Sequence, residues 1–152
     1  MQYCSLLDII NSYNVTEIKE SYLKLLSNLT GTVNIHNDIF LSQITNIISR
    51  GEIYICYIYI DGKIKIIGSG TILVEPKIIH GAKNVGHIED IVVDPEYNGK
   101  GIASLILQYL KDEAQNQNCY KIILDCKEEL ELFYNKNGFV KNGIQCSHYF
   151  DI

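Results

Sequence analysis

The stretch Val85–Ala103, VGHIEDIVVDPEYNGKGIA, is the most informative part of this chain for predicting its fold. Its middle holds the β-branched run Ile91-Val92-Val93, which is typical of a buried strand, and we predict a strand over Gly86–Val93. Asp94-Pro95 ends this strand, because proline has no N–H group to donate to a neighbouring strand. The glycine-rich segment Asn98–Ala103 follows and opens a helix. The stretch therefore predicts a strand, a sharp loop and the start of a helix.

The loop Asn98–Ala103 is suited to an anion. Glycines at the start of a helix, here predicted over Gly101–Gln117, leave the first backbone N–H groups uncovered at the positive end of the helix dipole. Lys100 adds a full positive charge. The loop lacks the Gly-Lys-Ser/Thr of a triphosphate-binding loop and the third glycine of a dinucleotide-binding loop. By itself it also fits a solvated, glycine-capped turn.

The whole stretch resembles the acetyl-CoA-binding segment of the GCN5-related N-acetyltransferases (GNAT), whose loop is usually written Gln/Arg-x-x-Gly-x-Gly/Ala. Gly101 and Ala103 fit this pattern, and Asn98 departs from it at the first position. The resemblance extends to one member family, the glucosamine 6-phosphate N-acetyltransferases, over roughly Leu29 to Phe139. Four further blocks occur in that family's order and spacing: Pro76–His80, Gly86–Asp90, Cys119–Cys126 and Phe133–Phe139.

Length, composition and charge limit the classes of protein to which this chain can belong. The 152 residues fit one domain, residues 1–152, with a real core. A net charge of −5 and the lack of a basic stripe argue against a nucleic-acid partner. No apolar run approaches the roughly 20 residues that cross a bilayer, and Met1–Cys4 does not read as a signal peptide. Five scattered cysteines without a C-x-x-C pair indicate a reduced, cytoplasmic protein with no metal site.

The remaining elements complete an α/β domain with a central mixed, mostly antiparallel sheet flanked by helices, which is the GNAT fold that the resemblance implies. We expect helices from Asn14 or Thr16 to about Asn28, over about Asp38–Ser49 and over Glu128–Asn137. We expect strands over Tyr3–Ile10, Glu52–Ile60, Lys65–Val74, Tyr120–Cys126, Phe139-Val140 and Cys146–Phe150. Asp61-Gly62 is a strong hairpin signal between two of them.

The resemblance implies a direct acetyl transfer. The amine of glucosamine 6-phosphate would attack the thioester of acetyl-CoA, on the route to UDP-N-acetylglucosamine. The strand would pair its backbone with the pantetheine, a bulge in it would direct one N–H at the thioester oxygen, and the loop would take the pyrophosphate. The implied cofactor-binding residues are Ile91, Val92, Val93, Asn98, Gly99, Lys100, Gly101, Ile102, Ala103, Tyr134 and Lys136.

Three residues are candidates for proton transfer. Glu89 and Asp90 precede the cofactor-binding part of the strand, and they lie on opposite faces if that strand is regular. The resemblance implies that both hold the amino sugar, and we assign Glu89 the role of general base and Asp90 a binding role. Tyr134 would donate a proton to the departing sulfur. The alternatives are a charged strand end facing water and a core tyrosine beside Phe133.

The acceptor site is implied by the resemblance in the same way. Its expected substrate-binding residues are Thr30, Lys77, Ile78, Ile79, His80, Glu89, Asp90, Ile91, Asp125, Cys126 and His148. Asp125 and Cys126 match positions that reach into a partner subunit's site, which implies a homodimer with shared sites. From the residues alone, Cys126 is a small buried hydrophobe in a strand, and Lys77 and His80 are also typical of a solvated surface.

One departure from the family keeps the substrate open. The family places an arginine near its C-terminus to hold the sugar phosphate, whereas Arg50 is the only arginine of this chain. Either Lys77 and His80 hold the phosphate together with His148, or the substrate is another small amine or an unphosphorylated amino sugar. A non-catalytic acyl-CoA-binding module is a third interpretation. The carboxylates and tyrosine proposed for proton transfer argue against it, because binding CoA needs none of them.

Overall fold

A five-stranded sheet forms the centre of the computed structural model, which describes residues 1–150. The spatial order of the strands follows the sequence: β1 (Gln2–Ser5), β2 (Gly51–Ile60), β3 (Lys63–Glu75), β4 (Asn84–Val93) and β5 (Cys119–Ile123). Neighbouring strands are antiparallel except for β4 and β5, which are parallel. The predicted mixed, mostly antiparallel sheet is confirmed.

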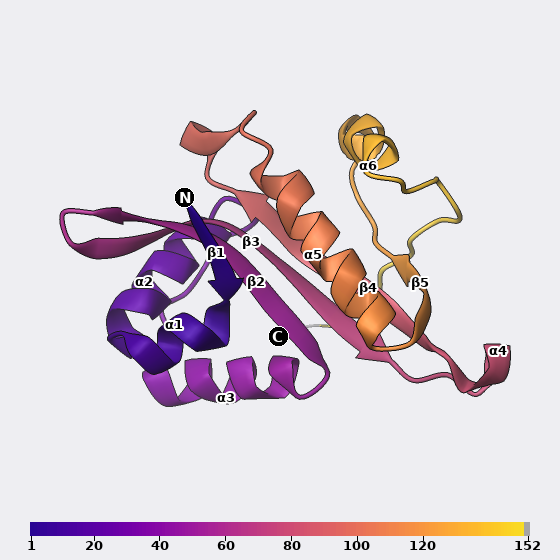
Figure 1. The fold of residues 1–152 in the computed structure, drawn as a ribbon, viewed down its shortest axis with the longest axis horizontal. Helices are drawn as coiled ribbons and strands as arrows, with labels where there is room; N and C mark the ends of the chain where they lie inside the picture. The colour runs from indigo at the N-terminus through magenta and orange to yellow at the C-terminus, as the bar shows by residue number, and fades with distance from the viewer. Residues whose placement is uncertain (151–152) are drawn as a thin grey trace.

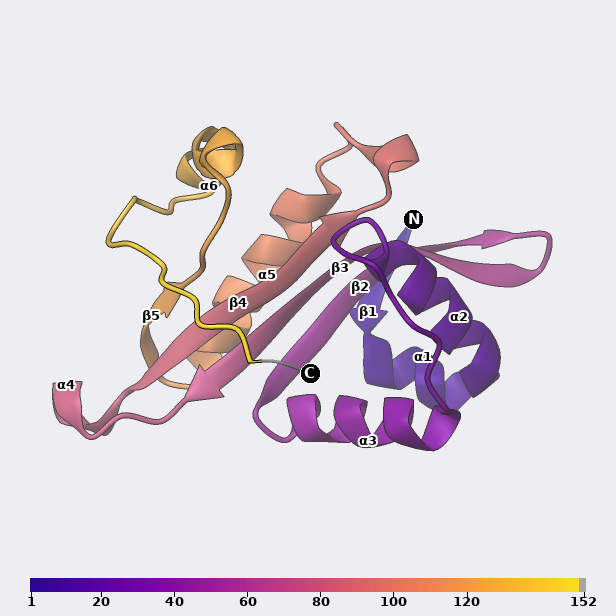
Figure 2. The same cartoon turned by 180° about the vertical axis from the view of Figure 1, so that it is seen from behind.

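Helices cover the two faces of the sheet unequally (Figures 1 and 2). The helices are α1 (Leu6–Ser12), α2 (Val15–Leu26), α3 (Asn37–Ile48), α4 (Ile79–Ala82), α5 (Ile102–Asn116) and α6 (Glu131–Lys136), with short 3₁₀ turns at Pro95–Tyr97 and Glu128–Leu130. Helix α5 lies on one face, and α1, α2 and α3 lie on the other, over the half that holds β1–β3. None of these helices is long and apolar enough to cross a bilayer within residues 1–150.

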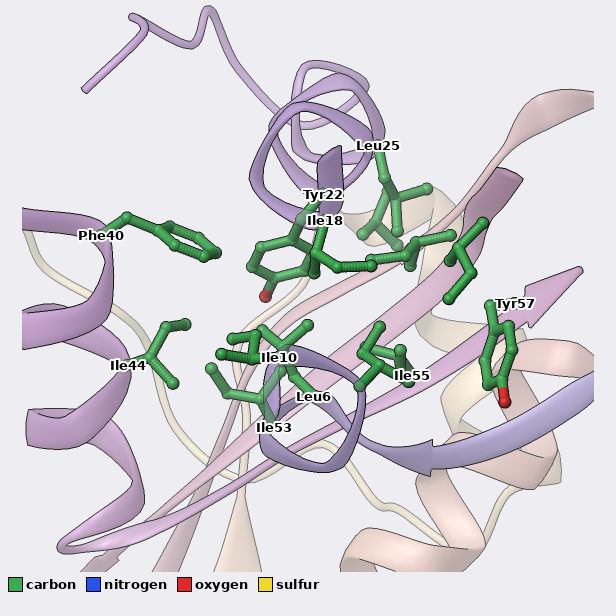
Figure 3. Packing of buried hydrophobic residues seen from close by; sticks show 14 residues of the cluster. Leu6, Ile10, Ile18, Tyr22, Leu25, Phe40, Ile44, Ile53, Ile55 and Tyr57 are labelled. Atoms are coloured by element: carbon green, nitrogen blue, oxygen red, sulfur yellow. The ribbon is translucent and has the colours of Figure 1, made fainter. Parts of the chain in front are cut away.

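Two apolar clusters hold these layers together. On the face of α1–α3, side chains from all three helices pack against Ile53, Ile55 and Tyr57 of β2 (Figure 3). On the other face, Ile102, Ile106, Leu107 and Leu110 of α5 pack against side chains of β2, β3 and β4. Burying one such side chain contributes about 1.5–3 kcal/mol relative to leaving it in water. The predicted amphipathic helix after the glycine-rich loop therefore anchors that loop to the sheet.

The hairpin between β2 and β3 forms at the predicted turn. Asp61 and Gly62 have φ angles of 49° and 77°, and Ile60 pairs with Lys63 across them. Two positive φ angles are the mark of the type I′ turn that matches the twist of the strands. Asn14 starts α2, because its side chain accepts a hydrogen bond from the N–H of Glu17.

The strand expected over Tyr3–Ile10 is wrong in its second half. β1 ends at Ser5, whose hydroxyl accepts a hydrogen bond from the N–H of Leu7 and so caps α1. Leu6, Ile9 and Ile10 then share one side of a helix and are buried, a spacing that suits a helix rather than a strand.

The C-terminal strands and the buried position of Cys126 are also wrong. β5 ends at Ile123, and Cys126 follows it as an exposed residue. Residues 140–150 are exposed and carry no strand, so neither Phe139-Val140 nor Cys146–Phe150 pairs with the sheet. A strand needs a paired neighbour for its N–H and C=O groups, and within the described chain no strand pairs with this segment.

Candidate active site

A β-bulge interrupts β4 within the stretch Val85–Ala103. The register between β3 and β4 shifts between Ser69 and Thr71. Gly70 of β3 there lies opposite two residues of β4, Asp90 and Ile91, and Asp90 has a φ of 52°. A Cβ atom on Gly70 would lie 2.5 Å from the side chain of Ile91 and 2.7 Å from that of Ile106, so a larger residue opposite the bulge would force these side chains to shift. The bulge that the resemblance implies is present.

The bulge changes which face each side chain of β4 takes. We expected Glu89 and Asp90 on opposite faces if the strand is regular. The strand is not regular here, because Asp90 is the bulged residue. Ile91 and Val93 now pack on the side of α5, and Val92 packs into the cluster of α1–α3. The carboxyl groups of Glu89 and Asp90 both belong to exposed residues. A bulge of this kind re-aims side chains and frees backbone groups beside active sites.

The part of β4 that carries the bulge is paired with β3 on one edge and is open on the other edge, the one toward β5. β4 and β5 pair only over Asn84–His87 and Cys119–Ile123. Beyond His87, no strand of the described chain pairs with β4 on that side. The N–H and C=O groups there are available to an extended ligand, in the manner of an added strand.

The surroundings of Glu89 raise its pKa. Partial loss of hydration raises the pKa of Glu89, and the negative charges of Asp125 and Asp90 raise it further, against the lowering effect of His87. A carboxyl group with a raised pKa holds a proton more firmly, which is what a general base needs.

The glycine-rich loop meets α5 as predicted. Gly99 and Gly101 have φ angles of 76° and 79°, in the left-handed region that favours glycine. Gly101 is the N-cap of α5, and no side chain caps this helix. Lys100 is exposed, and its Nζ lies 5.3 Å from the centre of the Tyr97 ring. The start of α5 thus presents free N–H groups and a cation to solvent.

Tyr134 lies on α6, on the side of the sheet that α5 covers, and is buried with 8% of its surface exposed. Its ring packs edge-on against Phe133 and Phe139. Burial, then the charges of Cys126 and Asp125, raise the pKa of Tyr134, so the phenol stays protonated at neutral pH and can donate. α6 is fixed to α5 by Lys111, whose Nζ donates to the carbonyl of Asn137 at 2.9 Å.

The residues expected to hold the sugar phosphate are only partly together. Lys77 forms a short ion pair with Glu75, and the other carboxylate oxygen of Glu75 lies 2.7 Å from His87 Nε2. His80, with a φ of 55°, stacks on Tyr120 at 4.2 Å between ring centres. The exposed Ile78 and Ile79 lie between them in sequence.

Other expected substrate-binding residues lie on separate exposed segments. Thr30 lies in the loop between α2 and α3. Asp125 and Cys126 follow β5, and His148 lies in the C-terminal segment. Lys136, expected to bind the cofactor, ends α6. Figure 2 shows this segment on the side of the sheet opposite α5, where it crosses β4. Within residues 1–150, His148 forms no hydrogen bond, ion pair or ring contact with Lys77 or His80.

Comparison with known proteins identifies the family. A model of the acetyltransferase (GNAT) family matches residues 17–139. The chain belongs to the GNAT acetyltransferase family. A glucosamine 6-phosphate N-acetyltransferase of Arabidopsis thaliana is 34% identical, over 93% of this chain and 96% of that protein. One from Dictyostelium discoideum is 35% identical, over 90% of this chain and 87% of that one.

Solved structures agree with this assignment. The crystal structure of glucosamine-6-phosphate N-acetyltransferase from Arabidopsis thaliana superposes with a TM-score of 0.85 at 29% identity, covering 99% of this chain and 98% of that one. A Trypanosoma brucei acetyltransferase superposes with a TM-score of 0.82 at 28% identity, covering 98% and 99%. The bulged β4, the glycine-opened α5 and the sheet order therefore belong to a GNAT acetyltransferase, and GNAT acetyltransferases use acetyl-CoA.

Sequence reasoning missed the supporting residues of the site. Glu75 and His87 pair across β3 and β4, which only the strand register reveals. Tyr22 of α2 accepts a hydrogen bond from Ser69 at 3.3 Å beside the bulge. Burial raises the pKa of Tyr22 to about 12, and the charge of Asp90 contributes to that rise. The sequence signal for Tyr22 was its place on the apolar side of α2, which predicts only a core residue.

Proposed function

We propose that this GNAT enzyme transfers the acetyl group of acetyl-CoA to the amine of glucosamine 6-phosphate. The observation that carries the proposal is the bulged, unpaired edge of β4 between the exposed carboxylates of Glu89 and Asp90 and the glycine-opened start of α5. The names of the relatives, which align over nearly the whole chain, supply the acceptor. The product would be N-acetylglucosamine 6-phosphate, on the route to UDP-N-acetylglucosamine.

The proposed donor site uses backbone groups. The pantetheine would extend the sheet along Ile91, Val92 and Val93, and an N–H at the bulge would meet the oxyanion that develops on the thioester. The pyrophosphate would bind the loop Asn98–Ala103, where the helix dipole and Lys100 offset its charge. Lys136, exposed at the end of α6, would contact the cofactor.

The proposed chemistry moves two protons. The amine nitrogen attacks the thioester carbon, its proton passes toward Glu89, and the C–S bond breaks. Tyr134 gives its proton to the departing sulfur, as its protonated phenol allows. Asp90 would bind the sugar. Within residues 1–150, no group of acidic, histidine or cysteine side chains is arranged to hold a metal ion.

The proposed acceptor site is completed by a second copy of the chain. Asp125 and Cys126 are exposed, and the C-terminal segment carries large apolar side chains that are 81–93% exposed: Val140, Ile144, Tyr149 and Phe150. Apolar side chains of this size usually find a partner surface. We propose a homodimer in which Asp125 and Cys126 reach the partner's sugar, with the phosphate held by Lys77, His80 and His148. Five free cysteines fit a reduced compartment such as the cytoplasm.

Release of free thiol from acetyl-CoA tests the function directly. We expect kcat/KM to be about 10-fold or more higher for glucosamine 6-phosphate than for glucosamine, because a bound phosphate makes charge-assisted hydrogen bonds. A lysine peptide should be inert. Equal efficiency with the two sugars would favour an enzyme for unphosphorylated amino sugars. CoA binding without thiol release from any amine would favour a non-catalytic acyl-CoA-binding module.

Sedimentation measurements test the homodimer. We expect a species of about twice the 17.3 kDa monomer mass at micromolar concentration. A chain truncated after Phe139 should sediment as a monomer if the exposed apolar segment forms the interface. A full-length chain that stays monomeric while acetylating the sugar would contradict the shared site.

A further inference from the structure

Glu75 and His87 form a hydrogen-bonded pair beside the proposed general base. His87 Nε2 lies 2.7 Å from Glu75 Oε2, and both side chains are partly exposed, at 32% and 44%. Leu73 of β3 lies opposite His87 of β4, and Glu75 lies two residues beyond Leu73, so the pair emerges on one face of the sheet. Glu89 follows His87 by two residues along β4 and takes the same face.

The geometry of this hydrogen bond defines the state of the imidazole. A carboxylate only accepts, so Nε2 carries the hydrogen and Nδ1 is left to accept a proton. The hydrogen bonds from Lys77 and then from His87 lower the pKa of Glu75, which is therefore a carboxylate at neutral pH. A fixed carboxylate on one nitrogen stabilises the imidazolium that forms when the other nitrogen takes up a proton.

Other charged groups lie on the strands and loops next to His87. Glu75 faces it from β3, and Lys77 follows in the next loop. Glu89 and Asp90 lie further along β4. From the side of β5, Lys121 pairs with Val85, two residues before His87, and Asp125 lies beyond the end of the strand. Of these groups, Glu75 is the one that contacts the ring directly, through the hydrogen bond to Nε2.

We propose that Glu75 and His87 form the proton-accepting pair behind Glu89, in which His87 takes up the proton that the substrate amine loses. This inference rests on the proposed acetylation. As the C–N bond forms and the C–S bond breaks, the amine proton passes through Glu89 and water to Nδ1 of His87. Glu75 holds the resulting imidazolium, Tyr134 protonates the thiolate, and solvent exchange restores both groups. An imidazole suits this task because it titrates near neutral pH in general, at about 6.5.

Glu75→Gln tests the pair with almost no change of shape. The amide oxygen can still accept from Nε2, but the negative charge that stabilises the imidazolium is lost. The acidic limb of the kcat–pH profile is the low-pH range in which kcat falls because the proton acceptor is already protonated. With both substrates saturating, we expect this limb to move to lower pH by about one unit in Glu75→Gln. Glu113→Gln is the matched control. Glu113 lies in α5 on the far side of the sheet, where it accepts a hydrogen bond from Gln117, and removing its charge should leave the acidic limb in place. An unmoved limb in Glu75→Gln would overturn the proposal.

Chemical rescue separates proton transfer from mere support. His87→Ala should lower kcat by about 10²-fold, and free imidazole in the buffer should restore part of it, because the lost group is a diffusible acid–base. Imidazole should have no effect on wild type or on Tyr134→Phe. If His87→Ala is folded by circular dichroism, slow, and not rescued, His87 only positions Glu89 and the relay is wrong.

The outcomes distinguish this inference from the proposed function. If wild type fails to acetylate glucosamine 6-phosphate but acetylates another amine, the assigned substrate is wrong, and the same profiles can be measured with that amine. If wild type acetylates glucosamine 6-phosphate and Glu75→Gln keeps its acidic limb, only the proton-accepting pair fails.

Discussion

Strands β1–β3 and strands β4–β5 differ in how their polar and apolar groups are satisfied. β2 has paired neighbours on both sides, and α1, α2 and α3 cover it with an apolar cluster in which Ile55 is fully buried. β4 remains paired with β3 but has no partner on the side of β5 beyond His87, and the bulge at Asp90 turns polar groups outward. Strands β1–β3 and the helices that cover them stabilise the fold through buried apolar surface. Around β4, β5 and the start of α5, backbone groups, carboxylates and a helix N-terminus are left unpaired. A ligand can bind these groups in place of the missing neighbours.

The largest effect that this comparison predicts concerns stability. Ile55→Ala, in the covered half, should lower the free energy of unfolding by about 3 kcal/mol, because the cluster of α1–α3 cannot refill the space. Ile78→Ala, in the open half, removes a side chain that is 94% exposed and should change it by less than about 0.5 kcal/mol. Urea denaturation followed by circular dichroism measures both. Similar losses for the two variants would mean that the halves do not divide the stability as proposed.

The next effect separates catalysis from stability in the open half. Tyr134→Phe should lower kcat by about 10²-fold with little change in either KM, since the hydroxyl acts only as the sulfur departs. Stability should hardly change, because the Tyr134 hydroxyl has no hydrogen-bond partner within residues 1–150. Steady-state kinetics and a thermal melt of the same preparation provide the measurement. Normal kcat with a lower melting temperature would make Tyr134 a core residue only.

The sequence predicted the elements whose signals are local. The β-branched run of β4, the glycine-rich loop, α5 and the hairpin at Asp61-Gly62 are each specified by residues within a few positions of one another. α1 was missed because its seven residues sit directly behind a strand and carry too few turns to show a clear helical period.

The missing parts of the site depend on contacts between distant segments. The bulge at Asp90 arises from the pairing of β4 with β3, where Gly70 leaves room for it, and no residue of β4 alone encodes it. The pair of Glu75 and His87 depends on the same register. The C-terminal strands were expected from their composition alone, although a strand forms only where another strand can pair with it.

A matched pair of variants tests the anion site at the open end of α5. Gly101 has a φ of 79°, and both asparagine and aspartate tolerate this left-handed region better than other side chains. Gly101→Asn should weaken acetyl-CoA binding only slightly. Gly101→Asp places a negative charge beside the pyrophosphate and should raise the Kd for CoA by about 10-fold more. Isothermal titration calorimetry measures both, and equal Kd values would remove this loop from the cofactor site.

The smallest effect concerns the sugar phosphate, which the chain must hold without a C-terminal arginine. Part of the charge of Lys77 is already offset by its ion pair with Glu75, so histidine would supply the balance. A histidine loses its charge as the pH rises, with an ordinary pKa near 6.5, so KM for glucosamine 6-phosphate should climb a few-fold between about pH 6.5 and 8.5. KM for acetyl-CoA should stay nearly flat over this range, because its proposed site uses backbone groups and Lys100.

Two substitutions assign that pH dependence to residues. His148→Ala should abolish the climb. The ionisation of the phosphate itself, near pH 6, is the same for wild type and variant, so the difference between the two profiles belongs to the protein. Lys77→Ala should raise KM at every pH and keep the slope, since lysine stays charged throughout this range. If the slope survives in His148→Ala and disappears in His80→Ala, the phosphate binds beside Tyr120 on the same subunit, and the C-terminal segment has no part in holding it.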